Sequence, residues 1–246
     1  MTVRPIRLVA IAHGEPSDAH RAAMQALTAA VAAGSESRVS WQIVDPQARD
    51  LIETVIASRP LPLSAVVPVV LSSDGPVRDR LALAFDRLRV PGLEVTEPLG
   101  PDPLLETVLA TRLRELGLSP DDIVVLAAAG SNDAHAVREY SGVARRLGGQ
   151  LGRPVTVGCI AAGSPRLSVA IDTARAVHPG ARVVVANYLL APGRFDSAAR
   201  AAGAEAVALP LVIPDVPVPT ELVQLVLARV AAAAGLVVGA GVPQPA

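Results

Sequence analysis

His13 is the residue of this sequence best placed to do chemistry. It directly follows a short apolar run, residues 8–12, and it precedes Gly14. A neutral imidazole can bind a divalent metal or accept a proton near neutral pH, so His13 is a candidate metal ligand and catalytic base. The position equally fits a histidine whose ring only bonds to the backbone of its own loop, and the residue types leave both interpretations open.

A second polar segment, Ser72-Ser73-Asp74, follows the apolar run at residues 65–71 and precedes Gly75-Pro76. A carboxylate at the end of a strand can contribute to a metal site, which makes Asp74 a candidate metal ligand beside His13. Aspartate is also frequent in turns before glycine and proline, where its side chain bonds to the backbone. A turn residue is therefore the alternative interpretation of Asp74.

The remaining histidines and the single cysteine fit structural roles. His20 and His135 lie two residues inside expected helices and are interpreted as solvated side chains, whereas His178 ends a helix, where a cation suits the dipole. Cys159 is the only cysteine, which excludes an internal disulfide and a cysteine-rich zinc or iron–sulfur site. We expect it to be a small buried residue of an apolar strand.

Short apolar runs alternate with longer amphipathic segments along the whole chain. The expected strands are 7–12, 38–44, 64–71, 93–97, 122–128, 155–160, 182–187 and 205–209. The expected helices are 18–33, 47–58, 77–88, 102–116, 133–151, 166–177, 194–202 and 219–234. Several strands are apolar on both faces, which is typical of a parallel sheet covered by helices on both sides. The sequence therefore predicts an α/β fold.

The two halves of the chain resemble each other. Residues 39–41 match residues 155–157, and residues 66–68 match residues 184–186. This repeat predicts two duplicated flavodoxin-like lobes, each a four-stranded parallel sheet flanked by helices, with a cleft between the lobes. We expect an N-terminal lobe at 1–117, a C-terminal lobe at 118–235 and a flexible tail at 236–246, because Gly117 and Pro120 interrupt the helical pattern.

Ligands of open parallel sheets gather outside the carboxyl ends of the strands. The loops expected there include Gly14, Gly130-Ser131 and Pro192-Gly193-Arg194, in which glycine lets backbone N–H groups approach a ligand. Arg194 can pair with a carboxylate of the ligand, or it can be a solvated residue that opens a helix. Neither G-x-G-x-x-G nor G-x-x-x-x-G-K spacing is present, so we expect no nucleotide cofactor.

Composition argues against two classes of partner. The net charge is −1, the 22 basic residues are all arginines spread along the chain, and few residues are aromatic, so a nucleic-acid-binding surface is not expected. No apolar run reaches the ~18 residues of a membrane-spanning helix, and the start of the chain lacks a secretory pattern. We therefore expect a cytoplasmic protein without a membrane partner.

Five short motifs together resemble one known family. They are His13-Gly14 at the end of the first apolar strand, the strand at residues 66–72, Pro98-Leu99-Gly100-Pro101-Asp102-Pro103-Leu104-Leu105, Gly130-Ser131-x-Asp133, and Tyr188-Leu189-Leu190-Ala191-Pro192-Gly193. In this order they resemble the class II tetrapyrrole chelatases, in the long duplicated form of the sirohydrochlorin and cobaltochelatase group called CbiX or SirB. The resemblance extends from about residue 8 to residue 234.

The resemblance implies a lyase of siroheme or cobalamin biosynthesis that inserts Co²⁺ or Fe²⁺, a substrate, into a sirohydrochlorin-type tetrapyrrole. His13 would bind the metal and accept a pyrrole proton, with Asp74 as a second ligand. The residues expected to contact the tetrapyrrole are Gly14, Ser72, Ser73, Gly130, Ser131, Pro192, Gly193 and Arg194. The first lobe would hold the chemistry and the second mainly the ring, since Ala129 matches His13. A monomer is expected because one chain carries both halves.

Two departures from the family keep an alternative open. The family's second histidine corresponds to Pro76, and a family glutamate on the second strand corresponds to Gln42. The alternative function is therefore a non-catalytic tetrapyrrole or metal carrier that has lost the second metal-binding histidine. An α/β interaction module that binds no tetrapyrrole is a third hypothesis.

Overall fold

The computed structural model describes residues 6–11, 17–35, 38–44, 64–72 and 93–239. Its eight strands are β1 (Ile6–Ile11), β2 (Val39–Val44), β3 (Ser64–Val69), β4 (Leu93–Val95), β5 (Ile123–Ala128), β6 (Val155–Cys159), β7 (Val183–Tyr188) and β8 (Ala206–Val207). They form two parallel sheets with equivalent strand orders, β2-β1-β3-β4 and β6-β5-β7-β8. The duplicated α/β fold is confirmed.

The helices of this part of the chain are α1 (Asp18–Ala33), α4 (Pro103–Glu115), α5 (Ala134–Leu151), α6 (Leu167–Val177), α7 (Arg194–Arg200) and α8 (Thr220–Gly239). The helices expected at 47–58 and 77–88 lie outside the described residues. The expectation of a loose tail from residue 236 is wrong for its first four residues, because α8 continues to Gly239. The apolar pair Val237-Val238 extends the helical segment, and no proline follows until Pro243.

Capping residues set where three of these helices begin. The side chain of Ser17 accepts the backbone N–H of His20, which starts α1. Asp102 caps α4 in the same way, with Pro103 in the first turn, and Asp133 caps α5. Asp102 and Asp133 directly follow the segments that leave β4 and β5, so these two caps mark where the next helix begins.

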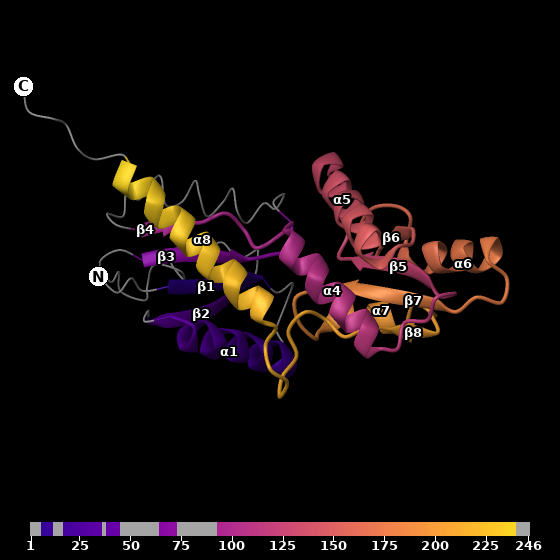
Figure 1. The fold of residues 1–246 in the computed structure, drawn as a ribbon, viewed down its shortest axis with the longest axis horizontal. Helices are drawn as coiled ribbons and strands as arrows, with labels where there is room; N and C mark the ends of the chain where they lie inside the picture. The colour runs from indigo at the N-terminus through magenta and orange to yellow at the C-terminus, as the bar shows by residue number, and fades with distance from the viewer. Residues whose placement is uncertain (1–5, 12–16, 36–37, 45–63, 73–92, 240–246) are drawn as a thin grey trace, which may run out of the picture.

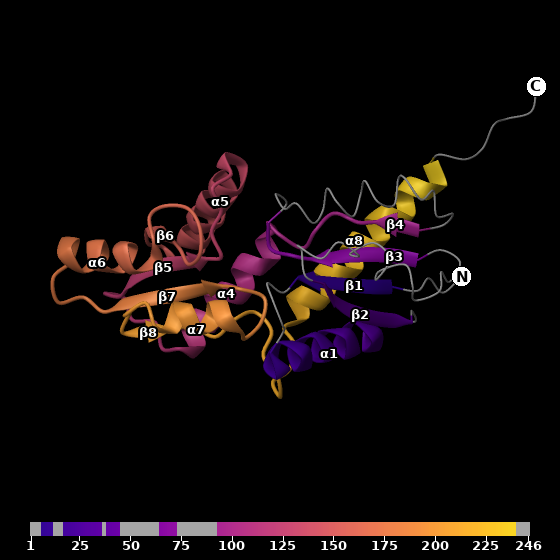
Figure 2. The same cartoon turned by 180° about the vertical axis from the view of Figure 1, so that it is seen from behind.

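The last helix of each half packs on the other half. Helix α4 ends the first half but contacts α5 and β7, whereas α8 ends the second half but contacts α1 and β3 (Figure 1). Seen from behind, α8 crosses the far face of the first sheet (Figure 2). The packed lobes thus differ from the expected chain halves 1–117 and 118–235, because each sheet obtains one covering helix from the opposite half.

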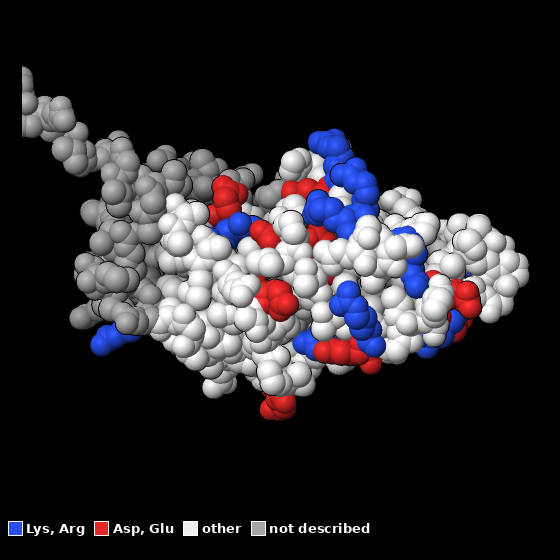
Figure 3. All heavy atoms as spheres, viewed as in Figure 1, with Lys and Arg blue, Asp and Glu red and all other residues white. Residues whose placement is uncertain are grey.

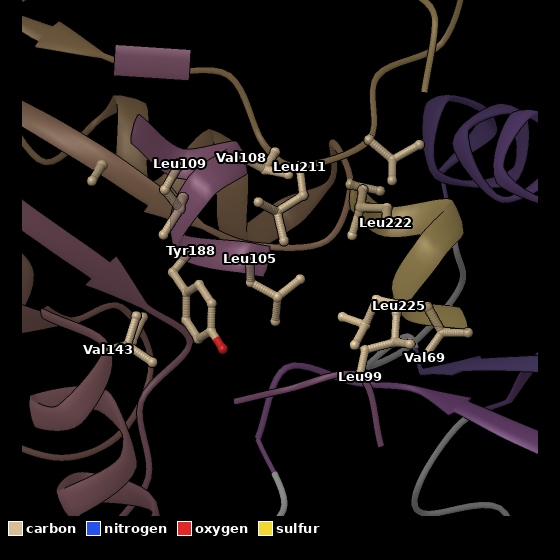
Figure 4. Packing of buried hydrophobic residues seen from close by; sticks show 14 of the residues in the cluster. Val69, Leu99, Leu105, Val108, Leu109, Val143, Tyr188, Leu211, Leu222 and Leu225 are labelled. Carbon is tan, nitrogen blue, oxygen red and sulfur yellow. The ribbon is translucent and has the colours of Figure 1, made fainter. Parts of the chain in front are cut away.

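This exchange joins the two halves through one hydrophobic core. The core extends from Val69 on the first sheet and Leu225 on α8 to Leu105 on α4, and then to Val143 and Tyr188 of the second half (Figure 4). A second, smaller cluster lies under α6 on the other face of the second sheet. Full burial of each large apolar side chain contributes about 1.5–3 kcal/mol, so the shared core resists separation of the lobes.

Two arginines hold the exchanged helices in equivalent ways. Arg229 of α8 donates hydrogen bonds to the carbonyl oxygens of Pro98 (2.8 Å) and Leu99 (3.2 Å) and to Asp102, the cap of α4 (2.9 Å). Arg112 of α4 donates to the carbonyl oxygen of Leu211 (3.3 Å). Each arginine therefore binds the backbone that leads into the opposite closing helix.

Replacing Arg229 with Met should destabilise the fold while keeping an apolar stem of similar length. The substitution leaves two backbone carbonyls and Asp102 without their charged donor, so we expect a loss of about 2–3 kcal/mol in the free energy of unfolding, measured by urea titration. Arg145→Met, at an exposed position on α5, is the control and should change it by less than about 0.5 kcal/mol. Equal stability of both variants would contradict the role given to Arg229.

Candidate functional site

The carboxyl ends of the two sheets meet at Tyr188. This residue ends β7, and its hydroxyl donates a 2.7 Å hydrogen bond to the carbonyl oxygen of Leu71, just after β3. Tyr188 is only 2% exposed. Burial raises its pKa well above the ordinary tyrosine value, and the negative charges of Glu106 and Glu139 add to this shift. The hydroxyl therefore stays protonated and joins the edges at which ligands of such sheets bind.

A polar chain crosses the junction beside Tyr188. Ser72 of the first half donates a 2.9 Å hydrogen bond to Oε2 of Glu139 on α5. The other oxygen of Glu139, Oε1, lies 3.3 Å from Nε2 of His135, one helical turn earlier. The Glu139 side chain is 10% exposed and that of His135 is 57% exposed. His135 is exposed, as expected of a solvated helix residue, and its ring also lies beside a nearly buried carboxylate.

His20 lies at a second contact between the halves. The hydroxyl of Ser17 is 3.5 Å from the carbonyl oxygen of Pro192, and Nδ1 of His20 lies 3.9 Å from the place where a Cβ on Gly193 would be. Within the described structure, the buried Nε2 of His20 has no hydrogen-bond partner. Burial lowers the pKa of His20, which favours the neutral ring. The prediction of a solvated side chain is wrong for His20, because the ring lies close to Gly193 and its Nε2 is buried.

The loop before α5 has a backbone that only glycine permits. Gly130 has φ +93°, and a Cβ there would lie 2.0 Å from the carbonyl oxygen of Ala162. The hydroxyl of Ser131 accepts the backbone N–H of Asp133 at 3.0 Å. Both residues therefore shape the loop that leads to His135, and their contact with a tetrapyrrole remains a prediction.

Arg194 is exposed at the first residue of α7, with its guanidinium 5.9 Å from the ring centre of Phe195. It is thus available to a ligand carboxylate. On the face shown in Figure 3 acidic and basic side chains are interspersed.

A buried carboxylate of α4 pairs with a half-exposed arginine of α5. Glu106 of α4 is fully buried and accepts hydrogen bonds from Nε (3.0 Å) and Nη2 (2.5 Å) of Arg146 on α5. Burial raises the pKa of Glu106, and the hydrogen bonds from Arg146 oppose that shift. Sequence reasoning missed this pair and the Ser72–Glu139 contact, because both join residues that are far apart in the chain.

The four expected site residues closest to the predicted chemistry, His13, Gly14, Ser73 and Asp74, lie outside the described residues, as does Pro76. Gln42 lies on β2, paired in register with Val9. Over the described ranges, no group of three or more His, Cys, Asp and Glu side chains is arranged to hold a metal. No helix within those ranges has the length and apolar character needed to span a membrane.

The comparison with known families bears on the first half of the chain. The CbiX family model matches residues 7–116. This span includes His13, Ser72 and the closing helix α4, and it confirms the resemblance to the class II chelatases. No curated protein sequence matches the chain.

Solved structures extend the similarity in fold to almost the whole chain. SirB from Bacillus subtilis with Fe³⁺ is 18% identical, with a TM-score of 0.67 over 96% of this chain and 98% of that chain. SirB from B. subtilis subspecies spizizenii in complex with cobalt is 16% identical, with a TM-score of 0.62 over 96% and 98% of the two chains. CbiX, the terminal enzyme of siroheme biosynthesis in denitrifying bacteria, is 19% identical, with a TM-score of 0.60 over 92% and 99%. These matches confirm the duplicated chelatase-like fold.

Replacing Tyr188 with Phe should weaken the junction in a pH-dependent way. At neutral pH we expect a loss of about 1–2 kcal/mol in the free energy of unfolding, because the carbonyl of Leu71 loses its donor. Since the folded pKa of Tyr188 is raised, wild type loses stability as pH rises above about 10, where the unfolded tyrosine ionises. The difference between the proteins should therefore shrink at alkaline pH. Urea titrations at pH 7 and above pH 10 measure this difference in the free energy of unfolding. A difference that stays the same at both pH values would contradict the role given to the Tyr188 hydroxyl.

Proposed function

We propose that this protein inserts Co²⁺ or Fe²⁺ into a sirohydrochlorin-type tetrapyrrole, in siroheme or cobalamin biosynthesis. The observation that carries the proposal is the match of residues 7–116 to the CbiX family model, on a chain of which 96% aligns with the fold of SirB. The junction at Tyr188 supports it, because a hydrogen bond there joins the carboxyl ends of β3 and β7, one from each sheet. One chain provides both halves, so the protein acts as a monomer in the cytoplasm.

Metal insertion requires that two pyrrole N–H groups lose their protons while the ion exchanges water for ring nitrogens. His13 would bind the incoming ion through a neutral imidazole or accept one of these protons, and Asp74 would be an oxygen ligand. The ion is weakly held by one imidazole and one carboxylate, which allows its transfer to the four nitrogens of the ring. No nucleotide takes part.

The tetrapyrrole would lie between the halves, with its carboxylates toward exposed donors. Arg194 can bind a carboxylate through two parallel hydrogen bonds. Backbone N–H groups of Gly14, Gly130 and Gly193 can approach the ring closely, and the hydroxyls of Ser72, Ser73 and Ser131 add polar contacts. Pro192 would provide an apolar surface for the ring.

A tetrapyrrole or metal carrier is the second candidate function. It is favoured by two sequence positions: Pro76 cannot ligate a metal, and Gln42 has an amide where the family has a carboxylate. Such a carrier would keep the fold and the ring-binding loops but would not accelerate metal insertion.

His13→Ala should separate these functions. Purified wild type, mixed anaerobically with sirohydrochlorin and Co²⁺ or Fe²⁺, should form the metallated spectrum faster than the protein-free control, because His13 supplies a ligand and a base. We expect the variant to lose most of this acceleration while it still binds the ring. Equal rates for wild type and variant would contradict the role of His13, and ring binding without any acceleration would identify a carrier.

A further inference from the structure

A groove in the second half of the chain lies between α5 and β6, two elements that are side by side (Figure 1). Its volume is about 560 Å³, and every residue that lines it belongs to the described part of the chain. Most of its walls are apolar, formed by Val137, Ala144, Pro154, Val155, Val157 and Pro165. The lining includes two arginines, Arg145 and Arg153, and no aspartate or glutamate. The groove therefore suits a ligand that combines apolar groups with a negative charge.

One wall of the groove is the free edge of a sheet. Among the described strands, β6 pairs only with β5, so one side of its backbone has no neighbouring strand. The N–H of Ile160 donates to the carbonyl oxygen of Ala128 on β5 (3.0 Å), whereas that of Cys159 faces outward and donates to the carbonyl oxygen of Pro165 (2.9 Å). Because backbone groups alternate along a strand, those of Val157 face the same outer side as those of Cys159. The edge of β6 can thus accept a further strand along the groove.

The chain itself pairs with one end of this edge. Cys159 and Arg166 form an isolated parallel bridge, and α6 begins at the residue after Arg166. The groove continues along the same edge from there to Pro154. Its wall on α5, from Val137 to Gly148, is about 16 Å long at a rise of about 1.5 Å per residue. That length holds about five residues of an extended segment at about 3.3 Å each.

The charge of the groove decides between possible occupants. Arg145 is exposed and makes no hydrogen bond or ion pair with any described residue. Nη1 of Arg153, in contrast, donates to the carbonyl oxygens of Ser119 (2.7 Å) and Asp122 (2.9 Å). A second copy of the chain, paired edge to edge about a two-fold axis, would bring the same arginines to a groove without acidic residues. Such a pairing places like charges together, whereas an acidic segment of another protein complements them.

We propose that the groove binds an extended, acidic segment of a partner protein, which adds a strand to the free edge of β6. The backbone of the segment bonds to the outward N–H and C=O groups of Val155 and Val157. Its apolar side chains contact Val137 and Ala144, and a carboxylate of the segment pairs with Arg145. This recognition goes beyond the proposed metal insertion and does not depend on it.

The test begins with a phage-displayed library of random heptapeptides, selected on the wild-type protein. We expect the selected peptides to alternate apolar residues with Asp or Glu, because successive side chains of a strand face opposite sides. The affinities of these peptides for wild type, Arg145→Glu and Arg138→Glu are then measured by fluorescence polarisation. Arg138 is the matched control, because it is exposed on the same helix and does not line the groove.

Arg145→Glu should weaken peptide binding on the order of 10-fold or more, because a charge-assisted hydrogen bond is replaced by a repulsion. Arg138→Glu should change the affinity less than about twofold. Replacing the acidic residue of the peptide with Lys should restore binding to Arg145→Glu and abolish binding to wild type. Methylation of single backbone nitrogens of the peptide tests the added strand. Alternate positions should lose binding, since alternate N–H groups of the peptide face β6.

Three results would overturn the proposal. The first is a selection that enriches no acidic peptides over the starting library. The second is an affinity for Arg145→Glu equal to that for Arg138→Glu, which would place the peptide outside the groove. The third is a series of N-methylated peptides without alternation, which would exclude an added strand. Should Arg145→Glu not fold, as judged by circular dichroism, Arg145→Met removes the same positive charge and decides by the same comparison with Arg138→Met.

Discussion

The exchange of α4 and α8 is the constraint on which the rest of the structure depends. Neither half covers its own sheet with its own last helix, since α4 packs against β7 and α8 packs against β3. The apolar residues of both helices therefore lie in one core shared by the two sheets. Separation of the lobes would expose that core to water, which costs far more than the polar contacts at the junction supply.

The shared core determines the geometry of the site. It holds the end of β7 against the end of β3 closely enough for the Tyr188 hydroxyl to reach the carbonyl of Leu71. The carboxyl ends of one strand from each sheet are therefore joined directly.

Local signals in the sequence predict much of the fold. Runs such as Ile123–Ala128 are apolar on both faces and form buried central strands, and the caps Asp102 and Asp133 mark where helices begin. The internal repeat predicts two sheets of equal order. These features depend on neighbouring residues, so periodicity and capping chemistry reveal them.

Features that depend on distant residues were not predictable in this way. The repeat gives no sign that α4 covers the opposite sheet, because an amphipathic helix fits either apolar surface. The interpretation of His135 and His20 as solvated follows from their places on helices. Their surroundings depend on distant residues. Ser72, more than sixty residues away in the chain, binds the partner of His135, and Gly193, more than one hundred residues away, lies near His20. Pairs such as Glu106 and Arg146 likewise appear only once the helices are packed.

The chain carries one natural probe in each sheet, which allows a direct test of the shared core. Trp41, the single tryptophan, lies on β2, and Cys159, the single cysteine, is buried at the end of β6. Urea unfolding should be followed by Trp41 fluorescence and, in parallel, by the reaction of the Cys159 thiol with a coloured disulfide reagent. If the exchanged helices make one core, both probes report one transition with the same midpoint and the same slope. Two separate transitions, with one sheet unfolding while the other stays folded, would contradict the account.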